Sequence, residues 1–501
     1  MENLTIAPIF QSHMVIQRDK PIVIWGTAPA QSNVTVTLCN CQNTSKTNNG
    51  TWKCTLPAQN AGTNYILSIA CSDAHTNAIV LEHVSIGDVW LACGQSNMEF
   101  FLRYDAEWES IKNYEKNPEI HMFNVPQLAF KGHQRNTDGY GFWFDDKDNG
   151  FETFSAPGYS FARHIQPSLG IPIGIIGCNW GGSTASTWLD ETYLQENPLS
   201  VYIEEYENAI KGHDPERLKQ ESMESWSFND SPEHSSDFIP LLYGRDEEWQ
   251  KQYLDNHKND PIIPMGPFHF NRPGGLYHQM LEPLTNFSIK GVLWYQGESD
   301  ALHADIYDLL FSSLICCWRK KWKDDLPFMF VQLAPFERWL DCDATNYPEV
   351  RHKQEIVSKT VNNTAMTSIM DIGCYYDIHP KQKMEVGRRL ALLALGKVYE
   401  RNILCENPEM ETGERKAHTI IFTLRNAEGL KNIGSIREFV LKQEEADVPI
   451  DHIFIQDNKI IVEARSLSVR SCHVFFAWTN YAEVNVFNSS GLPLKPFIWK
   501  E

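Results

Sequence analysis

Six apolar runs that alternate with helical patterns constrain the fold of this chain most strongly. The runs are, in chain order, "DVWLACG" (88–94), "IHMFNVP" (120–126), "PIGIIGCNW" (172–180), "GVLWYQGE" (291–298), "FMFVQLAP" (328–335) and "TAMTSIMDIG" (364–373). Near-continuous apolar strands are typical of a parallel sheet that helices cover on both faces. Apolar residues recur at helical spacing in "ADIYDLLFSSLICCW" (304–318) and in "KMEVGRRLALLALG" (383–396). We therefore predict a doubly wound α/β domain over residues 86–403.

The two flanks of this domain have a different pattern. Residues 1–85 and 404–501 alternate short β-branched or aromatic runs with turn clusters, which predicts an N-terminal β-sandwich-like domain and a C-terminal β-rich domain. Residues 191–270 interrupt the α/β alternation with a charged stretch that we expect to be irregular. We expect this insertion to cover or border the site, and the sequence leaves open whether it contacts a second subunit.

Charge and hydropathy exclude several classes of partner. The formal net charge is −20 over 501 residues, which disfavours binding to nucleic acid or to an anionic membrane surface. The sequence shows no basic leader and no window of about 18 apolar residues, so we expect a cytoplasmic protein. We interpret its 12 cysteines as reduced thiols. The oligomeric state is not predicted.

Polar side chains follow four of the predicted strands. In an open parallel sheet, ligands bind beyond the carboxyl ends of the strands. Those positions hold Gln95, Ser96 and Asn97 after the first run, Trp180, Gly181 and Gly182 after the third, Gln296 and Glu298 after the fourth, and Asp377 and His379 after the last.

This set contains the parts that acyl transfer requires. A serine hydroxyl becomes a nucleophile when a histidine accepts its proton and a carboxylate orients that histidine. An oxyanion hole could use the backbone N–H of Ser96, that of Gly181 or Gly182, and the side-chain amide of Gln296. Each motif alone also fits an ordinary turn or helix start. Their coincidence favours a serine hydrolase that needs neither a metal nor an organic cofactor.

The position of the serine separates two hydrolase folds. "GQSNM" has Met98 where the G-x-S-x-G elbow of α/β-hydrolases requires glycine. A serine after the first strand, followed late in the chain by Asp and His, fits a flavodoxin-like hydrolase.

The motifs "GQSNM", "NWGGS", "WYQGES" and "DIHP" occur in this order, and over nearly its whole length the chain resembles the sialate O-acetylesterases. That family belongs to the SGNH/GDSL hydrolase superfamily, which also includes acetylxylan esterases. The resemblance implies Ser96 as nucleophile and His379 as general base, with Gly181 or Gly182 and Gln296 completing the oxyanion hole. For the acidic partner of His379, Asp377 is the first choice, Glu298 the second and Asp371 the third. Gln95, Asn97 and Trp180 are candidate substrate-binding residues.

The predicted function is removal of O-acetyl groups from sugars, with sialic acid as the first candidate and an acetylated carbohydrate as the partner. Acetylxylan or another acetylated carbohydrate is the alternative substrate within the superfamily. Two more distant alternatives stay open: a lipase or thioesterase for long acyl chains, and a non-catalytic carbohydrate-binding protein.

Overall fold

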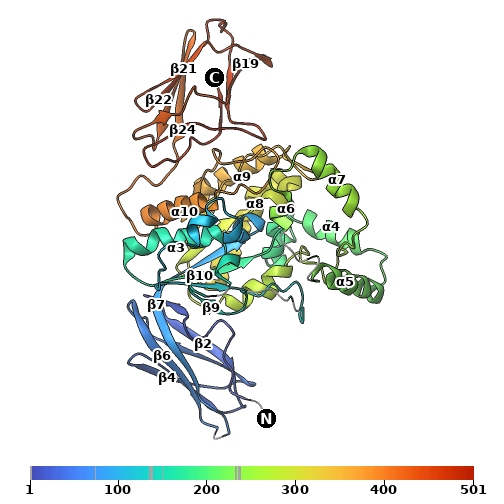
Figure 1. The fold of residues 1–501 in the computed structure, drawn as a ribbon, viewed down its shortest axis with the longest axis vertical. Helices are drawn as coiled ribbons and strands as arrows, with labels where there is room; N and C mark the ends of the chain where they lie inside the picture. The colour runs from blue at the N-terminus through green and yellow to red at the C-terminus, as the bar shows by residue number, and fades with distance from the viewer. Residues whose placement is uncertain are drawn as a thin grey trace.

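The structure is a computed structural model, and it describes residues 3–73, 75–133, 135, 139–148, 150–231, 234 and 238–501, with no side-chain description for residues 238 and 239. A helix-covered sheet lies in the middle of the molecule (Figure 1). The N-terminal strands, in blue, lie at one end and the C-terminal strands, in orange to red, at the other. The architecture is therefore a mixed sheet with helices and two additional β-rich regions.

The six apolar runs form the parallel strands of the central sheet. Their order across the sheet is β15 (Thr364–Thr367), β12 (Phe328–Val331), β11 (Gly291–Tyr295), β7 (Ile79–Gly94), β10 (Ile173–Asn179) and β8 (Ile120–Asn124), with β9 (Trp143–Phe144) added antiparallel at the edge. β8, β10 and β11 are buried along their whole length. Burial on both faces explains why these strands read as continuous apolar runs instead of alternating ones.

Two tryptophans show that helices pack on both faces of this sheet. Trp90 of β7 packs against Phe161 of α3 (Ala156–Leu169), with ring centroids 4.9 Å apart. Trp294 of β11 stacks on Phe311 of α8 (Tyr307–Trp322), with ring centroids 5.7 Å apart. Trp294 pairs with Cys93 of β7, so these two side chains point to the same face of the sheet. Cys93 is three residues after Trp90, and side chains alternate between faces along a strand, so Trp90 points to the other face. The two tryptophan rings therefore point to opposite faces.

The remaining helices and short elements complete the middle region. They are α1 (Ser96–Glu99), η1 (Leu102–Tyr104), α2 (Trp108–Ile111), η2 (Phe151–Thr153), η3 (Ala185–Trp188), η5 (Tyr277–Leu281), η6 (Glu282–Leu284), η7 (Glu298–Ile306), β13 (Arg338–Trp339), β14 (Cys342–Asp343), α9 (Tyr347–Thr360) and α10 (Lys383–Lys397). α10 packs closely beside α3. Gly387 permits this approach, because a Cβ at this position would collide with the Pro157 carbonyl.

One long strand joins the N-terminal region to the central sheet. The first part of β7 pairs antiparallel with β6 (Gly62–Cys71) and parallel with β1 (Val15–Gln17), and its second part pairs with β10 and β11. The boundary expected at residues 85 and 86 thus falls inside a strand, and a single hydrophobic core continues across it. The other N-terminal strands are β2 (Ile22–Thr27), β3 (Asn33–Leu38), β4 (Cys41–Lys46) and β5 (Thr51–Leu56).

The C-terminal strands enclose a core of their own, in which Phe422, Phe439, Phe476 and Phe497 contact one another. One four-stranded sheet is made of β16 (Glu409–Lys416), β17 (Thr419–Arg425), β22 (Lys459–Glu463) and β21 (His452–Gln456). The other is made of β20 (Ala446–Asp447), β19 (Phe439–Gln443), β23 (His473–Phe476) and β25 (Phe497–Lys500), and β18 (Lys431–Asn432) pairs with β24 (Val486–Phe487).

The insertion over residues 191–270 is largely helical, so the expectation of an irregular segment was wrong. It contains η4 (Glu191–Leu194), α4 (Val201–Ile210), α5 (Pro215–Asn229), α6 (Phe238–Leu242) and α7 (Glu247–His257). The side chains of Asp214 and Asp246 cap α5 and α7, a local signal that charge content had obscured. Residues 232–233 and 235–237 of its polar stretch lie outside the described residues.

The insertion also reaches the surroundings of the predicted site. The amide of Gln250 on α7 donates to the carbonyl of Tyr376, and its oxygen accepts a hydrogen bond from the backbone N–H of Leu340. Tyr376 and Leu340 lie in the segments that carry His379 and Trp339. The insertion therefore borders the site, as expected.

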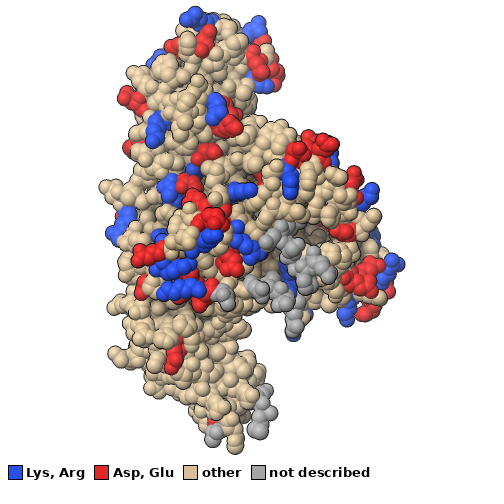
Figure 2. All heavy atoms as spheres, in the orientation of Figure 1, with Lys and Arg blue, Asp and Glu red and all other residues tan. Residues whose placement is uncertain are grey.

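Surface charge and apolar segments complete the picture. On the face shown in Figure 2, acidic and basic side chains intermingle over the middle and C-terminal regions, and the N-terminal region carries few of them. All 12 cysteines are unpaired.

One segment, Glu298–Trp322, is by length and composition long and apolar enough to cross a membrane, which was not expected from the sequence. Half of its apolar window is buried inside the fold.

Candidate active site

Ser96 stands at the carboxyl end of β7, where the strand passes directly into α1. Gly94, with φ of +151°, lies against the backbone of Tyr295 on the neighbouring strand, where a side chain would collide. The backbone N–H of Gln95 donates to the Tyr295 carbonyl at 3.2 Å. This tight exit delivers the Ser96 side chain to the edge of the sheet beyond the strand ends, where a ligand can reach it.

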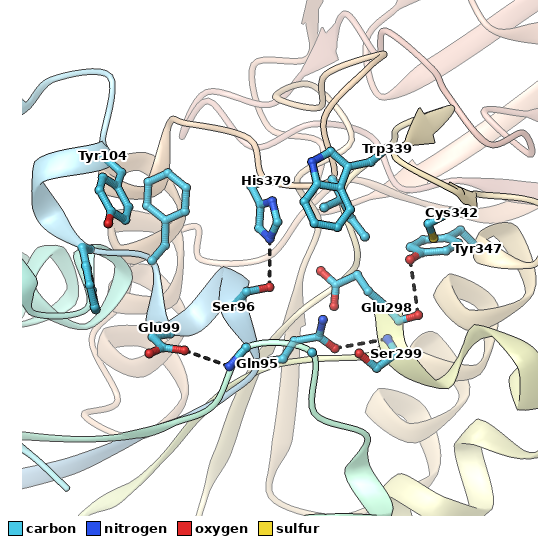
Figure 3. Close-up of a pocket in the computed structure, with 15 residues that line it drawn as sticks. Gln95, Ser96, Glu99, Tyr104, Glu298, Ser299, Trp339, Cys342, Tyr347 and His379 are labelled. Carbon is cyan, nitrogen blue, oxygen red and sulfur yellow. Dashed lines mark hydrogen bonds between the residues drawn. The ribbon is translucent and has the colours of Figure 1, made fainter. Parts of the chain in front are cut away.

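His379 comes to Ser96 from a loop that follows β15. Its Nε2 lies 2.9 Å from Ser96 Oγ (Figure 3). The imidazole is buried, and the Trp339 ring packs edge-on against it at 5.0 Å between centroids. A hydroxyl and an imidazole at this separation have the geometry that acyl transfer requires of a nucleophile and its general base.

Asp377 is the carboxylate nearest to that imidazole. Its Oδ1 lies 3.3 Å from His379 Nδ1 and accepts a hydrogen bond from the His379 backbone N–H at 2.8 Å. The Nδ1 contact is within ion-pair reach but lacks hydrogen-bond geometry, and Nδ1 has no other partner among the described residues. Burial lowers the pKa of His379, and Asp377 opposes that effect. A lowered pKa keeps the imidazole in its neutral, proton-accepting form near neutral pH.

The other two candidate carboxylates have different partners. Glu298 lines the pocket and accepts a hydrogen bond from Asn97 Nδ2 at 2.5 Å through Oε1. Its Oε2 is buried without a hydrogen-bond partner among the described residues, and burial raises the pKa of Glu298 to about 7. Asp371 forms a bidentate ion pair with Arg389, both bonds at 2.7 Å. By distance, therefore, Asp377 is the carboxylate placed to act on His379.

The expected oxyanion hole is only partly available. Gly181 and Gly182 both line the pocket beside Ser96, but the Gly181 N–H donates to Glu99 Oε2 at 2.8 Å. Within the described part of the chain, no acceptor is found for the N–H groups of Gly182 and Ser96.

Gln296 does not reach the pocket, which corrects the role expected for it. Its side chain is fully buried, and its amide nitrogen donates to the Ser183 carbonyl and to Asp300. Its amide oxygen accepts a hydrogen bond from the Tyr307 hydroxyl. Both amide hydrogens are thus engaged in the fold, and none is left for an oxyanion.

Two ionisable residues at the site, Glu99 and the buried Lys383, were missed by sequence reasoning. The carboxylate of Glu99 accepts hydrogen bonds from Gln127, Tyr140 and Gly181, and its burial raises its pKa. Lys383 is fully buried beneath the His379 loop, and burial lowers its pKa to about 7. Their spacing was the available signal, because Glu99 follows Ser96 by three residues and Lys383 follows His379 by four.

The pocket above Ser96 is a cavity of about 550 Å³ with aromatic walls. The aromatic residues that line it are Phe100, Phe101, Tyr104, Trp339 and Tyr347. No Lys or Arg is found among its described lining residues, whose acidic members are Glu99 and Glu298. The aromatic run "EFFLRY" at 99–104 was the sequence signal for one wall.

Trp180, expected to contact substrate, is buried outside this lining. Its ring stacks on Phe270 at 5.3 Å between centroids, and the Arg135 guanidinium lies over it at 5.1 Å. Within the described residues, no group of three or more His, Cys, Asp or Glu side chains gathers as a metal ion would require.

A serine hydroxyl beside a buried histidine, open to an aromatic pocket at the strand ends, is an arrangement found in serine hydrolases, the class to which many esterases belong. The family model "Carbohydrate esterase, sialic acid-specific acetylesterase" matches residues 86–215 and 265–395, more than half of the chain. The chain belongs to this family of carbohydrate esterases. The matched stretches contain Ser96, Gly182, Glu298 and His379, and the gap between them falls within the helical insertion.

Relatives of known activity cover nearly the full length. The chain is 27% identical to the sialate O-acetylesterase of Rattus norvegicus, over 98% of this chain and 93% of the relative. It is 25% identical to the human sialate O-acetylesterase, over 98% of this chain and 92% of the relative. The crystal structure of a carbohydrate acetylesterase from Xanthomonas citri superposes with a TM-score of 0.76 at 25% identity, covering 99% of both chains.

Proposed function

We propose that this esterase removes O-acetyl groups from sugars through an acetyl-serine intermediate on Ser96, with O-acetylated sialic acid as the first candidate substrate. The observation that carries the proposal is the 2.9 Å contact between Ser96 Oγ and the Nε2 of buried His379 at the floor of an open pocket. The names of the rat and human relatives support the choice of sialic acid.

The proposed reaction has two halves. In the first, Ser96 Oγ bonds to the acetyl carbonyl carbon while His379 Nε2 takes the hydroxyl proton, and the carbonyl π electrons move to oxygen. The tetrahedral intermediate collapses, the bond to the sugar oxygen breaks, and His379 returns the proton to that oxygen. In the second, water replaces the sugar, and the same proton transfers release acetate and free Ser96. The Asp377 carboxylate stabilises the positive charge that forms on the His379 imidazole.

The strand order supports a place for the middle region in the SGNH superfamily. Numbered from the strand that carries Ser96, the order β10-β7-β11-β12-β15 is 2-1-3-4-5, with β8 as an additional edge strand. This is the order of flavodoxin-like doubly wound folds. Residues 86–403 are the proposed hydrolase domain, with β7 extending into the proposed N-terminal domain of residues 1–85 and residues 404–501 forming the third.

A second candidate substrate class is favoured by the lining of the pocket. Sialic acid carries a carboxylate, and recognition of a carboxylate usually employs Arg or Lys. The described lining offers aromatic faces and the acidic side chains of Glu99 and Glu298 instead. Acetylated neutral sugars are therefore the alternative substrate.

A comparison of Ser96→Ala with the exposed-serine control Ser110→Ala tests the proposal. We expect Ser96→Ala to abolish acetate release from an aryl acetate without changing the far-UV circular dichroism, and Ser110→Ala to match wild type. Acetate release from O-acetylated sialic acids and from acetylated xylo-oligosaccharides then decides the sugar. Activity at wild-type level in Ser96→Ala, or turnover that rises with acyl chain length, contradicts an acetyl-serine esterase.

A further inference from the structure

One donor of the expected oxyanion hole, the side-chain amide of Gln296, is engaged in the fold and does not line the pocket. Hydrolysis by Ser96, on which this inference rests, places negative charge on the former carbonyl oxygen, and such an oxygen is stabilised by preorganised N–H groups. The Gly181 N–H is held by Glu99, and both amide hydrogens of Gln296 are held by Ser183 and Asp300. The N–H groups of Ser96 and Gly182 remain, both beside the pocket.

Gln95 supplies an amide at the right place. Its side chain is buried, with 3% of its surface exposed, and it lines the same pocket as Ser96. Its Oε1 accepts hydrogen bonds from the backbone N–H groups of Gly297 and Ser299, each at 3.3 Å. An amide nitrogen cannot accept such bonds, so these two contacts fix which end of the amide is oxygen.

The other end of this amide faces the cavity. With Oε1 turned to the Gly297–Ser299 backbone, Nε2 points toward the space between Ser96 and Glu298 (Figure 3). Among the described residues, none accepts a hydrogen bond from Nε2. An N–H donor that faces the pocket without a protein partner is free to donate to a ligand bound there.

We propose that Gln95 is a catalytic residue whose Nε2–H donates to the oxyanion, together with the backbone N–H groups of Ser96 and Gly182. The donation begins as the bond between Ser96 Oγ and the carbonyl carbon forms and the π electron pair moves to oxygen. It ends when that pair returns and the sugar oxygen leaves with the proton from His379. Gln95 neither gains nor loses a proton. Gln296 has a structural role, because its amide is bonded to Ser183 and Asp300. Gln95, one residue before the nucleophile, therefore supplies the amide donor that was expected from Gln296.

Two substitutions separate donation from a purely structural role. Gln95→Met removes both the donor and the Oε1 acceptor, whereas Gln95→Glu keeps an acceptor for the Gly297 and Ser299 N–H groups, removes the amide donor and, when ionised, adds a negative charge. We expect both variants to lower kcat for an aryl acetate on the order of 100-fold, as loss of one oxyanion donor does elsewhere, with KM within about 3-fold of wild type. Thermal unfolding shows whether each variant is folded.

Three outcomes overturn the assignment. The first is a kcat within about 3-fold of wild type in Gln95→Met. The second is a loss confined to KM. The third is a deficient Gln95→Met beside a fully active Gln95→Glu, which makes the side chain an anchor for the Gly297–Ser299 backbone. Ser96→Ala is assayed in parallel to distinguish a failure of this inference from a failure of the proposed function. Activity in Ser96→Ala would contradict the acetyl-serine reaction itself, whereas an inactive Ser96→Ala beside an active Gln95→Met contradicts only the role of Gln95.

Discussion

Lys383 Nζ donates a hydrogen bond to Asn97 Oδ1 at 2.6 Å and another to the Pro380 carbonyl at 2.6 Å. Asn97 Nδ2 in turn donates to the Ile378 carbonyl at 3.0 Å. The two carbonyls belong to the residues on either side of His379. Asn97, which follows Ser96 in the chain, therefore holds the loop of His379 on both sides, directly through Ile378 and, through Lys383, at Pro380.

Asn97→Ala should lower kcat while leaving KM nearly unchanged. Without the amide, the loop that carries His379 loses its link to α1, and a displacement of about 1 Å between reacting groups costs on the order of 100-fold in rate. Asn97→Asp, which keeps an acceptor for Lys383 but cannot donate to Ile378, should show a similar loss. Steady-state kinetics with an aryl acetate measures both. The exposed Asn113→Ala serves as the matched control, and a wild-type kcat in Asn97→Ala means that the loop is held without it.

Asp377→Asn should move the pH dependence of activity as well as its level. His379 must be neutral to accept a proton, so kcat/KM falls as pH decreases through the pKa of His379, which burial holds below its ordinary 6.5. Asp377 opposes that lowering, so its removal should shift the acid limb to still lower pH. The lost stabilisation of the imidazolium should lower kcat on the order of 100-fold. A pH–rate profile tests both effects. An acid limb that stays in place or moves to higher pH assigns the supporting carboxylate elsewhere.

Glu298→Gln should change how stability depends on pH. The ordinary pKa of a glutamate is 4.5, and burial raises that of Glu298 to about 7 in the folded protein. Between these values the folded protein holds a proton that the unfolded chain has released, so this contribution is fully present below pH 4.5 and is lost as pH rises through 7. Relative to Glu298→Gln, wild type should lose about 3 kcal/mol of unfolding free energy across that range.

Urea unfolding at a series of pH values measures this difference. The neighbours that bear on Glu298 are Asn97 and Lys383, which favour its charged form, and Asp300, which disfavours it. The exposed Glu216→Gln is the matched control and should leave the wild-type curve unchanged. Parallel curves for wild type and Glu298→Gln would show that Glu298 titrates alike in the folded and unfolded chains.

The sequence predicted the elements whose signals are local. The apolar runs at 88–94, 172–180 and 291–298 became neighbouring buried strands, because continuous burial on two faces requires continuous apolar residues. Ser96 and His379 were predicted as partners from their positions after strands, and they lie 2.9 Å apart. The helical insertion was not predicted, because its charged residues hid the capping aspartates Asp214 and Asp246.

The tertiary structure decided what each polar group does, because hydrogen-bond partners come from segments far apart in the chain. By sequence Gln95 and Gln296 are both glutamines at strand ends. Only the fold, which places Ser183 and Asp300 against Gln296 and Gln95 in the lining of the pocket, separates an amide engaged in the core from one that can meet a ligand. The sequence by itself thus determined the strands and predicted that Ser96 and His379 meet at their ends. The burial of Glu298 and Lys383, and with it the shift of their pKa values, arose only when packing removed water from around them.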